Sequence, residues 1–172
     1  EAIRISKEMI VLSLGHIDIG GYGKGYLIDL VADRLKTKHH LEHFLINGGG
    51  DMYGTSNLGE PITIYLEHPS TPDTYLEKTT LLNEGFAASS TQKRRWESAG
   101  KVYTHIVDTK TGQSSQSSLG IFVKAPTAAM ADAWATTLLI SAPENHLEMM
   151  QRKSIRAAAY DEQQNTLSYY GV

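Results

Sequence analysis

The sequence predicts an α+β fold in which a mixed, largely antiparallel sheet packs against helices. Short alternating or β-branched segments, typical of strands, recur along the 172 residues without the strict strand–helix alternation of parallel sheets. Two longer segments, 24–38 and 127–141, carry helical patterns instead. A chain of this length can bury a core of its own, so we expect a single domain.

The first third of the chain should contain two short strands, a helix and a third strand. Residues 2–14 alternate and are broken by a polar turn, which predicts a strand pair. The helix expected over 24–38 depends on four apolar residues at helical spacing, Leu27, Ile28, Val31 and Leu35. Residues 43–46 are then expected to form a buried strand that ends in the glycine turn N-G-G-G-D.

The remainder should be mainly strands, followed by two helices and a hairpin. The expected strands are 61–67, 74–82, 101–107 and 118–124, with a polar segment at 89–100 between them. Pro126 marks the start of the helix over 127–141, and a second helix is expected at 143–152. Residues 155–160 and 166–170 should close the chain as a hairpin.

Composition narrows the classes of partner. The net charge of −3 gives no bulk attraction to nucleic acid or to anionic membranes, so we expect no nucleic-acid partner. The chain contains no cysteine, which excludes disulfides and thiolate metal sites. No apolar run approaches the roughly 18 residues that cross a bilayer. Because residue 1 is Glu and not Met, we expect a processed or truncated chain.

The glycine-rich stretch D-I-G-G-Y-G-K-G-Y, residues 18–26, stands between a predicted strand and a predicted helix. It matches neither the Walker A pattern nor the dinucleotide pattern G-x-G-x-x-G. Several glycines nevertheless let backbone N–H groups approach an anion, next to a helix N-terminus and the charge of Lys24. The same glycines could instead serve a sharp turn and close helix packing. Both interpretations stay open on these residues alone.

Asp132 is the only charged residue between Lys124 and Glu144, in a helix that is apolar nearly all round. Such a helix should be buried, and a buried carboxylate needs a partner. Thr136 lies one turn later on the same face. A carboxylate and a hydroxyl, completed by phosphate oxygens and water, suit Mg²⁺. The alternative is an ion pair with a basic residue such as Lys24.

Two further segments carry polar groups with more than one interpretation. His105 ends an alternating run three residues before Asp108, so it could be a general base or an ordinary sheet histidine. The run N-G-G-G-D, residues 47–51, could bind an adenine or a sugar through its backbone, or simply turn the chain.

Five segments in the same order resemble the motifs of the ApbE family, the flavin transferases that move FMN from FAD onto a protein. They are D-I-G-G-Y-G-K-G-Y (18–26), L-I-N-G-G-G-D (45–51), F-A-A-S-S (86–90), H-I-V-D-T-K-T-G (105–112) and A-D-A-W-A-T (131–136). Each match is weak alone, but five collinear matches are specific. The chain departs from the family pattern at Gly23, Ser90 and Thr109, where the family usually has Ala, Gly and Pro.

The resemblance implies the C-terminal portion of an ApbE-like fold and a set of site residues. Mg²⁺ would be held by Asp132, Thr136 and the backbone carbonyl of Gly23. FAD would be bound as substrate by residues of the first four motifs, namely Gly21, Tyr22, Lys24, Asn47, Gly49, Gly50, Asp51, Ser89, His105 and Ile106. A threonine or serine hydroxyl of an acceptor protein would attack the FMN-side phosphorus and AMP would leave, with Asp132 and His105 as the catalytic residues.

The resemblance also implies partners and a location. The usual acceptors are subunits of membrane redox complexes, and family members are commonly exported and lipid-anchored, so we expect an extracytoplasmic protein, membrane-anchored in its full-length form. The family's large N-terminal portion is missing, so residues 1–172 are expected to be one truncated ApbE-like domain. Either that portion or a second subunit would complete the flavin pocket. The alternatives are a non-catalytic FAD-binding module and an FAD pyrophosphatase that yields AMP and FMN.

Overall fold

The computed structural model describes residues 3–13, 15–92, 94–108, 111–114, 119–150 and 154–171. Its strands are β1 (Ile3–Ile5), β2 (Ile10–Leu12), β3 (Phe44–Asn47), β4 (Met52–Thr55), β5 (Ile62–Glu67), β6 (Tyr75–Leu81), β7 (Glu84–Ser90), β8 (Arg95–Ser98), β9 (Lys101–Thr104), β10 (Leu119–Ala125), β11 (Arg156–Asp161) and β12 (Thr166–Tyr170). Its helices are α1 (Gly23–His39), α2 (Ala128–Ile140) and α3 (His146–Met150), with a 3-10 turn at Pro143–Asn145 before α3.

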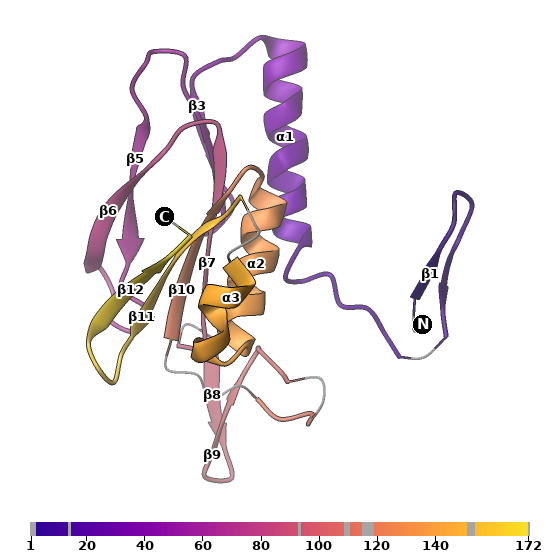
Figure 1. Cartoon of the computed structure of the whole chain (residues 1–172), viewed down its shortest axis with the longest axis vertical. Helices are drawn as coiled ribbons and strands as arrows, with labels where there is room; N and C mark the ends of the chain where they lie inside the picture. The colour runs from indigo at the N-terminus through magenta and orange to yellow at the C-terminus, as the bar shows by residue number, and fades with distance from the viewer. Residues whose placement is uncertain are drawn as a thin grey trace.

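A six-stranded sheet in the order β12-β11-β10-β7-β4-β3 forms the centre of the molecule (Figure 1). All its described pairs are antiparallel. Side chains such as Ile121 and Val123 pack on the helix side, whereas Phe122 packs on the side of the β5–β6 hairpin. The predicted α+β fold with a largely antiparallel sheet is therefore confirmed. Within the described residues, no helix is both long and apolar enough to cross a membrane.

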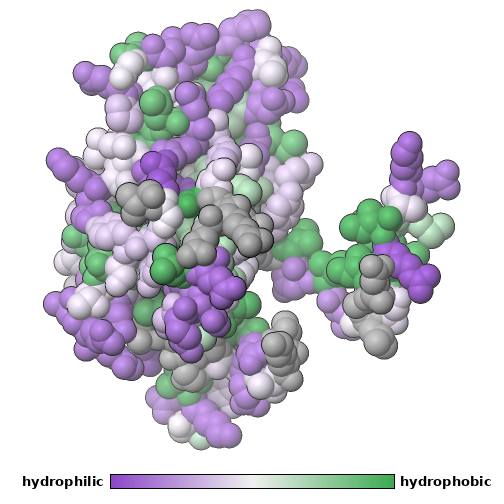
Figure 2. All heavy atoms as spheres, in the orientation of Figure 1, coloured by the Kyte–Doolittle hydropathy of each residue, from purple (hydrophilic) through white to green (hydrophobic). Residues whose placement is uncertain are grey.

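Most of the predicted elements are confirmed. The helices expected over 24–38 and 127–141 are α1 and α2, and the strand pair within 2–14 is β1–β2. The second C-terminal helix is shorter than expected, because 143–145 form the 3-10 turn before α3 and residues 151–152 lie outside the described part. The β1–β2 hairpin stands apart from the body and exposes apolar side chains (Figures 1 and 2).

One prediction was wrong and another was incomplete. Residues 43–46 do not form a buried strand: β3 is an edge strand, and Leu45 on it is 42% exposed. Residues 89–100 are polar, as expected, but they are not only a connection between strands, because they hold the end of β7 and all of β8. The central strand β7, with the sequence E-G-F-A-A-S-S, is rich in small residues that carry little strand propensity. Small residues are needed on this strand because α2 packs directly against β7 and leaves no room for large side chains on that face.

Two glycines set the distance between α2 and its neighbours. A Cβ added at Gly25 of α1 would lie 2.4 Å from the carbonyl oxygen of Ala128. A Cβ added at Gly85 of β7 would lie 2.3 Å from the backbone nitrogen of the same residue. No side chain fits at either point, so α1, α2 and β7 approach one another at backbone contact distance.

Replacing Gly25 with alanine should therefore destabilise the protein by about 1–3 kcal/mol, since the added methyl group must displace the α2 backbone. Urea unfolding measures the change. Gly23→Ala is the matched control on the same helix, because its added Cβ would come no closer than 3.7 Å to its neighbour Ile19. Equal unfolding midpoints for the two variants would contradict the close packing.

Tyr169 of β12 donates a hydrogen bond to the carboxylate of Glu77 on β6 and so ties the β5–β6 hairpin to the sheet. Partial burial, together with the hydrogen bond and charge of Glu77, raises the pKa of Tyr169 to about 12. The folded-state pKa is higher than the unfolded one, so the stabilisation is complete below about pH 10 and is lost as pH rises through about 12. An ultraviolet phenolate titration should show a group near 12 that Tyr169→Phe lacks. Superimposable curves above pH 11 would contradict this assignment.

Candidate functional site

The ammonium group of Lys24 lies between two buried carboxylates. Its Nζ is 3.0 Å from both side-chain oxygens of Asp132 and 3.1 Å from Oδ2 of Asp51. The carbonyl oxygen of Gly20 is also 3.1 Å away. Three segments of the chain that are distant in sequence thus converge on one cation.

Each of the three groups is fixed by its own element. Lys24 stands in the first turn of α1, where the N–H of Gly25 donates to Oδ2 of Asp132 at 3.2 Å. Asp132 projects from the middle of α2. Asp51 closes the N-G-G-G-D turn between β3 and β4, and its carbonyl accepts from the N–H of Gly48 at 2.8 Å. The predicted burial of Asp132 and its alternative pairing with Lys24 are both confirmed.

Asn47 organises the glycine turn that carries Asp51. Its side-chain oxygen accepts hydrogen bonds from the N–H groups of Gly49 and Gly50, both at 3.0 Å. Gly49 and Gly50 adopt φ values of 88° and 109°, which favour glycine. The turn therefore requires this sequence for its shape, independently of any ligand.

The two carboxylates are buried much more deeply than their cation. The side chains of Asp51 and Asp132 are 4% and 3% exposed, whereas that of Lys24 is 48% exposed. Burial, followed by the charge of Asp132, raises the pKa of Asp51, and the charge of Lys24 offsets only part of this. Burial alone would lower the pKa of Lys24, but its hydrogen bond to Asp132 and the charge of Asp51 raise it overall. The cluster thus favours a cation and disfavours a second buried negative charge.

Thr136 links the cluster of Lys24, Asp51 and Asp132 to β7 and to the glycine-rich stretch 18–26, which we call the glycine loop. Its hydroxyl lies 3.4 Å from the hydroxyl of Ser89. A Cβ added at Gly21 would lie 3.1 Å from Oγ1 of Thr136, so the loop passes directly over this residue. The predicted residues of the first, second, third and fifth motifs therefore lie around one region, with Ser89 and Thr136 on the side toward the sheet.

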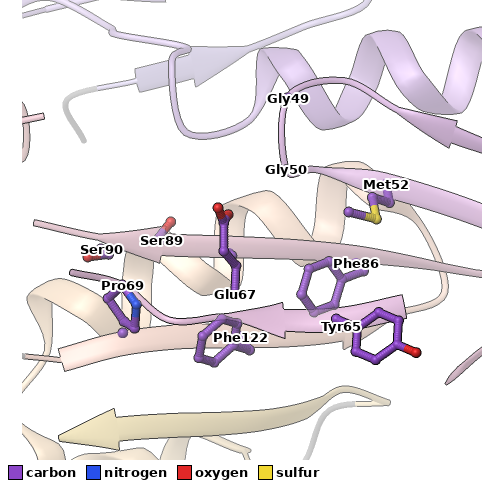
Figure 3. Close-up of a pocket in the computed structure, with 12 residues that line it drawn as sticks. Gly49, Gly50, Met52, Tyr65, Glu67, Pro69, Phe86, Ser89, Ser90 and Phe122 are labelled. Atoms are coloured by element: carbon purple, nitrogen blue, oxygen red, sulfur yellow. The ribbon is translucent and has the colours of Figure 1, made fainter. Parts of the chain in front are cut away.

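A cavity of about 110 Å³ begins beside Ser89 and extends over the sheet face that the β5–β6 hairpin covers (Figure 3). Its walls combine aromatic rings, small residues and one carboxylate: Gly49, Gly50, Met52, Tyr65, Glu67, Pro69, Phe86, Ala88, Ser89, Ser90, Gly120 and Phe122. The β4–β7 pairing ends at Met52 and Phe86, where the chain turns away into the glycine turn. Gly49 and Gly50 of that turn line the cavity together with Ser89. The cavity therefore adjoins the region in which Ser89 and the glycine turn lie.

The other predicted site residues have varied surroundings. Tyr22 precedes α1, is half-exposed and stacks on Tyr26 with ring centroids 5.7 Å apart. Gly23 is the first residue of α1, and the loop carbonyl that reaches Lys24 belongs to Gly20 instead. Ile106 packs against the hydrophobic core, which is a structural role. Their predicted contacts with FAD or metal stay predictions.

His105 follows β9 and is exposed. Its ring Nδ1 lies 3.4 Å from the carbonyl oxygen of Arg94, and its backbone N–H donates to the same oxygen at 3.3 Å. A carbonyl only accepts, so this contact favours the neutral tautomer that carries the ring proton on Nδ1 and leaves Nε2 as the acceptor.

The residues present fit a divalent cation that keeps part of its shell for substrate or water. Two carboxylates, the hydroxyl of Thr136 and the carbonyl of Gly20 are all oxygen donors, as Mg²⁺ prefers. Oδ2 of Asp51 is buried without a hydrogen-bond partner. No group of three or more His, Cys, Asp or Glu side chains clusters among the described residues. The donor set therefore suits Mg²⁺ shared with a ligand better than an all-protein metal cage.

A family model described as the ApbE family matches residues 2–160. The chain belongs to the ApbE family. A curated relative from Escherichia coli (strain K12), named FAD:protein FMN transferase, is 28% identical over 144 residues, which are 81% of this chain and 41% of the relative. A relative of the same name from Haemophilus influenzae is 29% identical over 159 residues, or 87% and 46%. The chain thus spans less than half the length of these ApbE relatives.

Solved ApbE structures confirm the fold. The ApbE protein of Thermotoga maritima superimposes with a TM-score of 0.84 at 20% identity, covering 98% of this chain and 57% of that one. The apo form of the flavinyl transferase ApbE from Pseudomonas stutzeri gives 0.76 at 24% identity, covering 98% and 53%.

Sequence reasoning missed one residue that holds the site together. Asp29 of α1 accepts hydrogen bonds from the N–H groups of Ala128 and Ala129, at 2.8 and 2.9 Å, and so caps the N-terminus of α2. Its signal was a single carboxylate inside the apolar run Y-L-I-D-L-V.

Asp29→Ala should lower the free energy of unfolding by about 1–2 kcal/mol, because two helix N–H groups lose their acceptor. Thermal or urea unfolding measures the loss. Asp33→Ala is the control: this carboxylate lies one turn further along α1 and is exposed, so little change is expected. A loss as large for Asp33→Ala would contradict the capping role.

Proposed function

We propose that this chain carries the metal and pyrophosphate site of a Mg²⁺-dependent FAD:protein FMN transferase. The observation that supports this most directly is the convergence of Lys24, Asp51 and Asp132 beside the glycine loop. That arrangement joins a cation, oxygen donors for a metal and a glycine-rich backbone at one place, as a pyrophosphate substrate requires. The names of the curated relatives favour the same reaction.

In the proposed complex, Asp132 and Thr136 hold Mg²⁺, together with a carbonyl of the glycine loop. Gly23 was the carbonyl expected from the family motif, and Gly20 is the one nearest to Lys24 in the structure. Bound Mg²⁺ would neutralise charge on the FAD pyrophosphate as the phosphorus is attacked. Lys24 would add its charge, and the N-terminus of α1 its partial charge, to the same phosphate oxygens.

We infer that a planar ring of FAD occupies the cavity next to Ser89. The cavity is lined by aromatic side chains that can stack on such a ring, and by Gly49 and Gly50, whose backbone can approach a sugar or base. Figure 3 shows the carboxylate of Glu67 pointing toward the side on which the glycine turn lies. Glu67 could there accept a hydrogen bond from a ribose hydroxyl or an exocyclic amine.

The proposed reaction transfers FMN by a single displacement at phosphorus. A threonine or serine oxygen of the acceptor forms a bond to the FMN-side phosphorus, and the bridging P–O bond breaks. AMP leaves with that electron pair, and the hydroxyl proton passes to a base. We propose His105 for this base, because the contact of its Nδ1 with Arg94 leaves Nε2 free to accept a proton.

The partners and location are likewise proposed. The acceptor is a subunit of a membrane redox complex, and the full-length protein is extracytoplasmic and membrane-anchored. We propose that the family's N-terminal portion, or a second subunit, completes the flavin pocket. Exposed apolar side chains on β1, β2 and the outer face of α1 support this, among them Ile5, Ile10, Leu27 and Leu30.

The test is an FMN-transfer assay with FAD, Mg²⁺ and a flavin-free subunit of a membrane redox complex. The expected result is a fluorescent flavinylated acceptor and one AMP released per transfer. Asp132→Asn and Thr136→Val should lower the rate at least about a hundredfold, because the first removes the negative charge that holds the metal and the second removes a hydroxyl ligand. Thr137→Val is the matched control, since among the described residues this hydroxyl donates its hydrogen bond to the carbonyl of Ala133 in the same helix, away from the cluster.

The same assay separates the two alternatives. An FAD pyrophosphatase would yield AMP and free FMN without any acceptor. A non-catalytic FAD-binding module would quench flavin fluorescence but release no AMP at any Mg²⁺ concentration. Either outcome would reject the transferase.

A further inference from the structure

The ammonium group of Lys24 has fewer protons to donate than there are oxygen atoms around it. It carries three protons, but four oxygens lie within 3.0–3.1 Å of Nζ. The two oxygens of Asp132 and the carbonyl of Gly20 accept hydrogen bonds, and Oδ2 of Asp51 is left buried without one. A divalent cation differs in this respect, because it takes six or more oxygen ligands.

Exposure also distinguishes the cation from its partners. Asp51 and Asp132 are almost completely buried, whereas half of the Lys24 side chain faces solvent. The lysine can therefore swing into water with its charge solvated. The carboxylates cannot follow, and leaving them without a cation would be costly. Any departure of Lys24 thus requires another cation at the same place.

We propose that Lys24 holds the cation position in the metal-free protein and that a divalent cation displaces it. The displaced ammonium then becomes available to the anionic substrate. This inference builds on the proposed function, since it concerns the order of events at the same site.

Displacement couples the binding of metal and anion. Without metal, the charge of Lys24 is already taken up by Asp51 and Asp132, and an incoming anion meets two carboxylates. With metal bound, those carboxylates are neutralised and Lys24 is free. Metal should therefore raise the affinity for the anion, and by linkage the anion should raise the affinity for the metal to the same extent.

The competing explanation is that Lys24 is a fixed anchor that stays on the carboxylates while metal binds. The two explanations predict opposite effects of removing its charge. If Lys24 competes with the metal, removing its charge lets the metal bind more tightly. If Lys24 is a fixed anchor, removing it disorders the carboxylate ligands, so the metal binds equally or more weakly.

Titration calorimetry of the metal-free chain with Mg²⁺ alone tests the exchange. Lys24→Gln should bind Mg²⁺ at least about tenfold more tightly than the wild type does. In this variant no charge-assisted hydrogen bonds of Lys24 need to be broken before the metal binds. Lys24→Arg keeps a cation there and should not bind more tightly. Lys38→Gln at the exposed end of α1 is the matched control for lost charge, and should change little in 0.1 M salt. Asp132→Asn should abolish binding.

Equal or weaker Mg²⁺ binding by Lys24→Gln would overturn the exchange, and so would no binding by either protein. Without metal, Lys24→Gln should melt at a lower temperature than the wild type, and Mg²⁺ should stabilise it more. If it is unfolded without metal, recovery of its circular dichroism on adding Mg²⁺ supports the exchange, and no recovery overturns it. These Mg²⁺ titrations contain neither FAD nor acceptor protein. If they show the exchange but the FMN-transfer assay shows no transfer, the proposed function is rejected and the exchange stands.

Discussion

The ion pair between Lys24 and the buried Asp132 is the interaction on which the rest of the site depends. Asp132 lies in a helix that is otherwise apolar, so its charge must be neutralised by a group from elsewhere in the chain. That group sits in the first turn of α1, and it reaches Asp132 only because Gly25 has no side chain between the helices. Asp29 then fixes the same helix pair at the N-terminus of α2. The charge of Asp132 is thus met across a helix contact whose closeness Gly25 allows.

The same constraint explains the unusual composition of the central strand. Because α2 must lie close to both α1 and the sheet, β7 has small residues where α2 crosses it, with Gly85 in direct backbone contact. This closeness brings Thr136 to Ser89 and so connects the helix layer with the sheet. On the other face of the sheet, Phe86 and Phe122 restore the bulk that a core requires. The strand is therefore shaped by its helix more than by its own propensity.

Sequence patterns predicted the parts of this structure that depend on local spacing. The helical periodicity of α1, and the single charge in α2 with its burial, followed from residues near in sequence. The pairing of Asp132 with Lys24 joins residues distant in sequence and was predicted only as one of two alternatives. The edge position of β3 and the existence of β7 did not, because pairing partners and tertiary contacts decided them. Asp51 carried a predicted role in FAD binding, but its approach to Lys24 depends on how the glycine turn folds back. The residues next to Asp51 in the sequence therefore do not predict its contact with Lys24.

The charge balance of the cluster bears on its chemistry. Two carboxylates and one ammonium leave a net charge of −1 when all are ionised, and such a site would repel a pyrophosphate. The raised pKa of Asp51 reflects the same imbalance, since burial and Asp132 both oppose its ionisation. A divalent cation would turn the balance to +1 and would allow Asp51 to ionise without cost from its neighbour. When all three groups are ionised, the cluster by itself thus lacks one positive charge, and Oδ2 of Asp51, which contacts Lys24 only as an ion pair at 3.1 Å, is an oxygen that an added cation could reach.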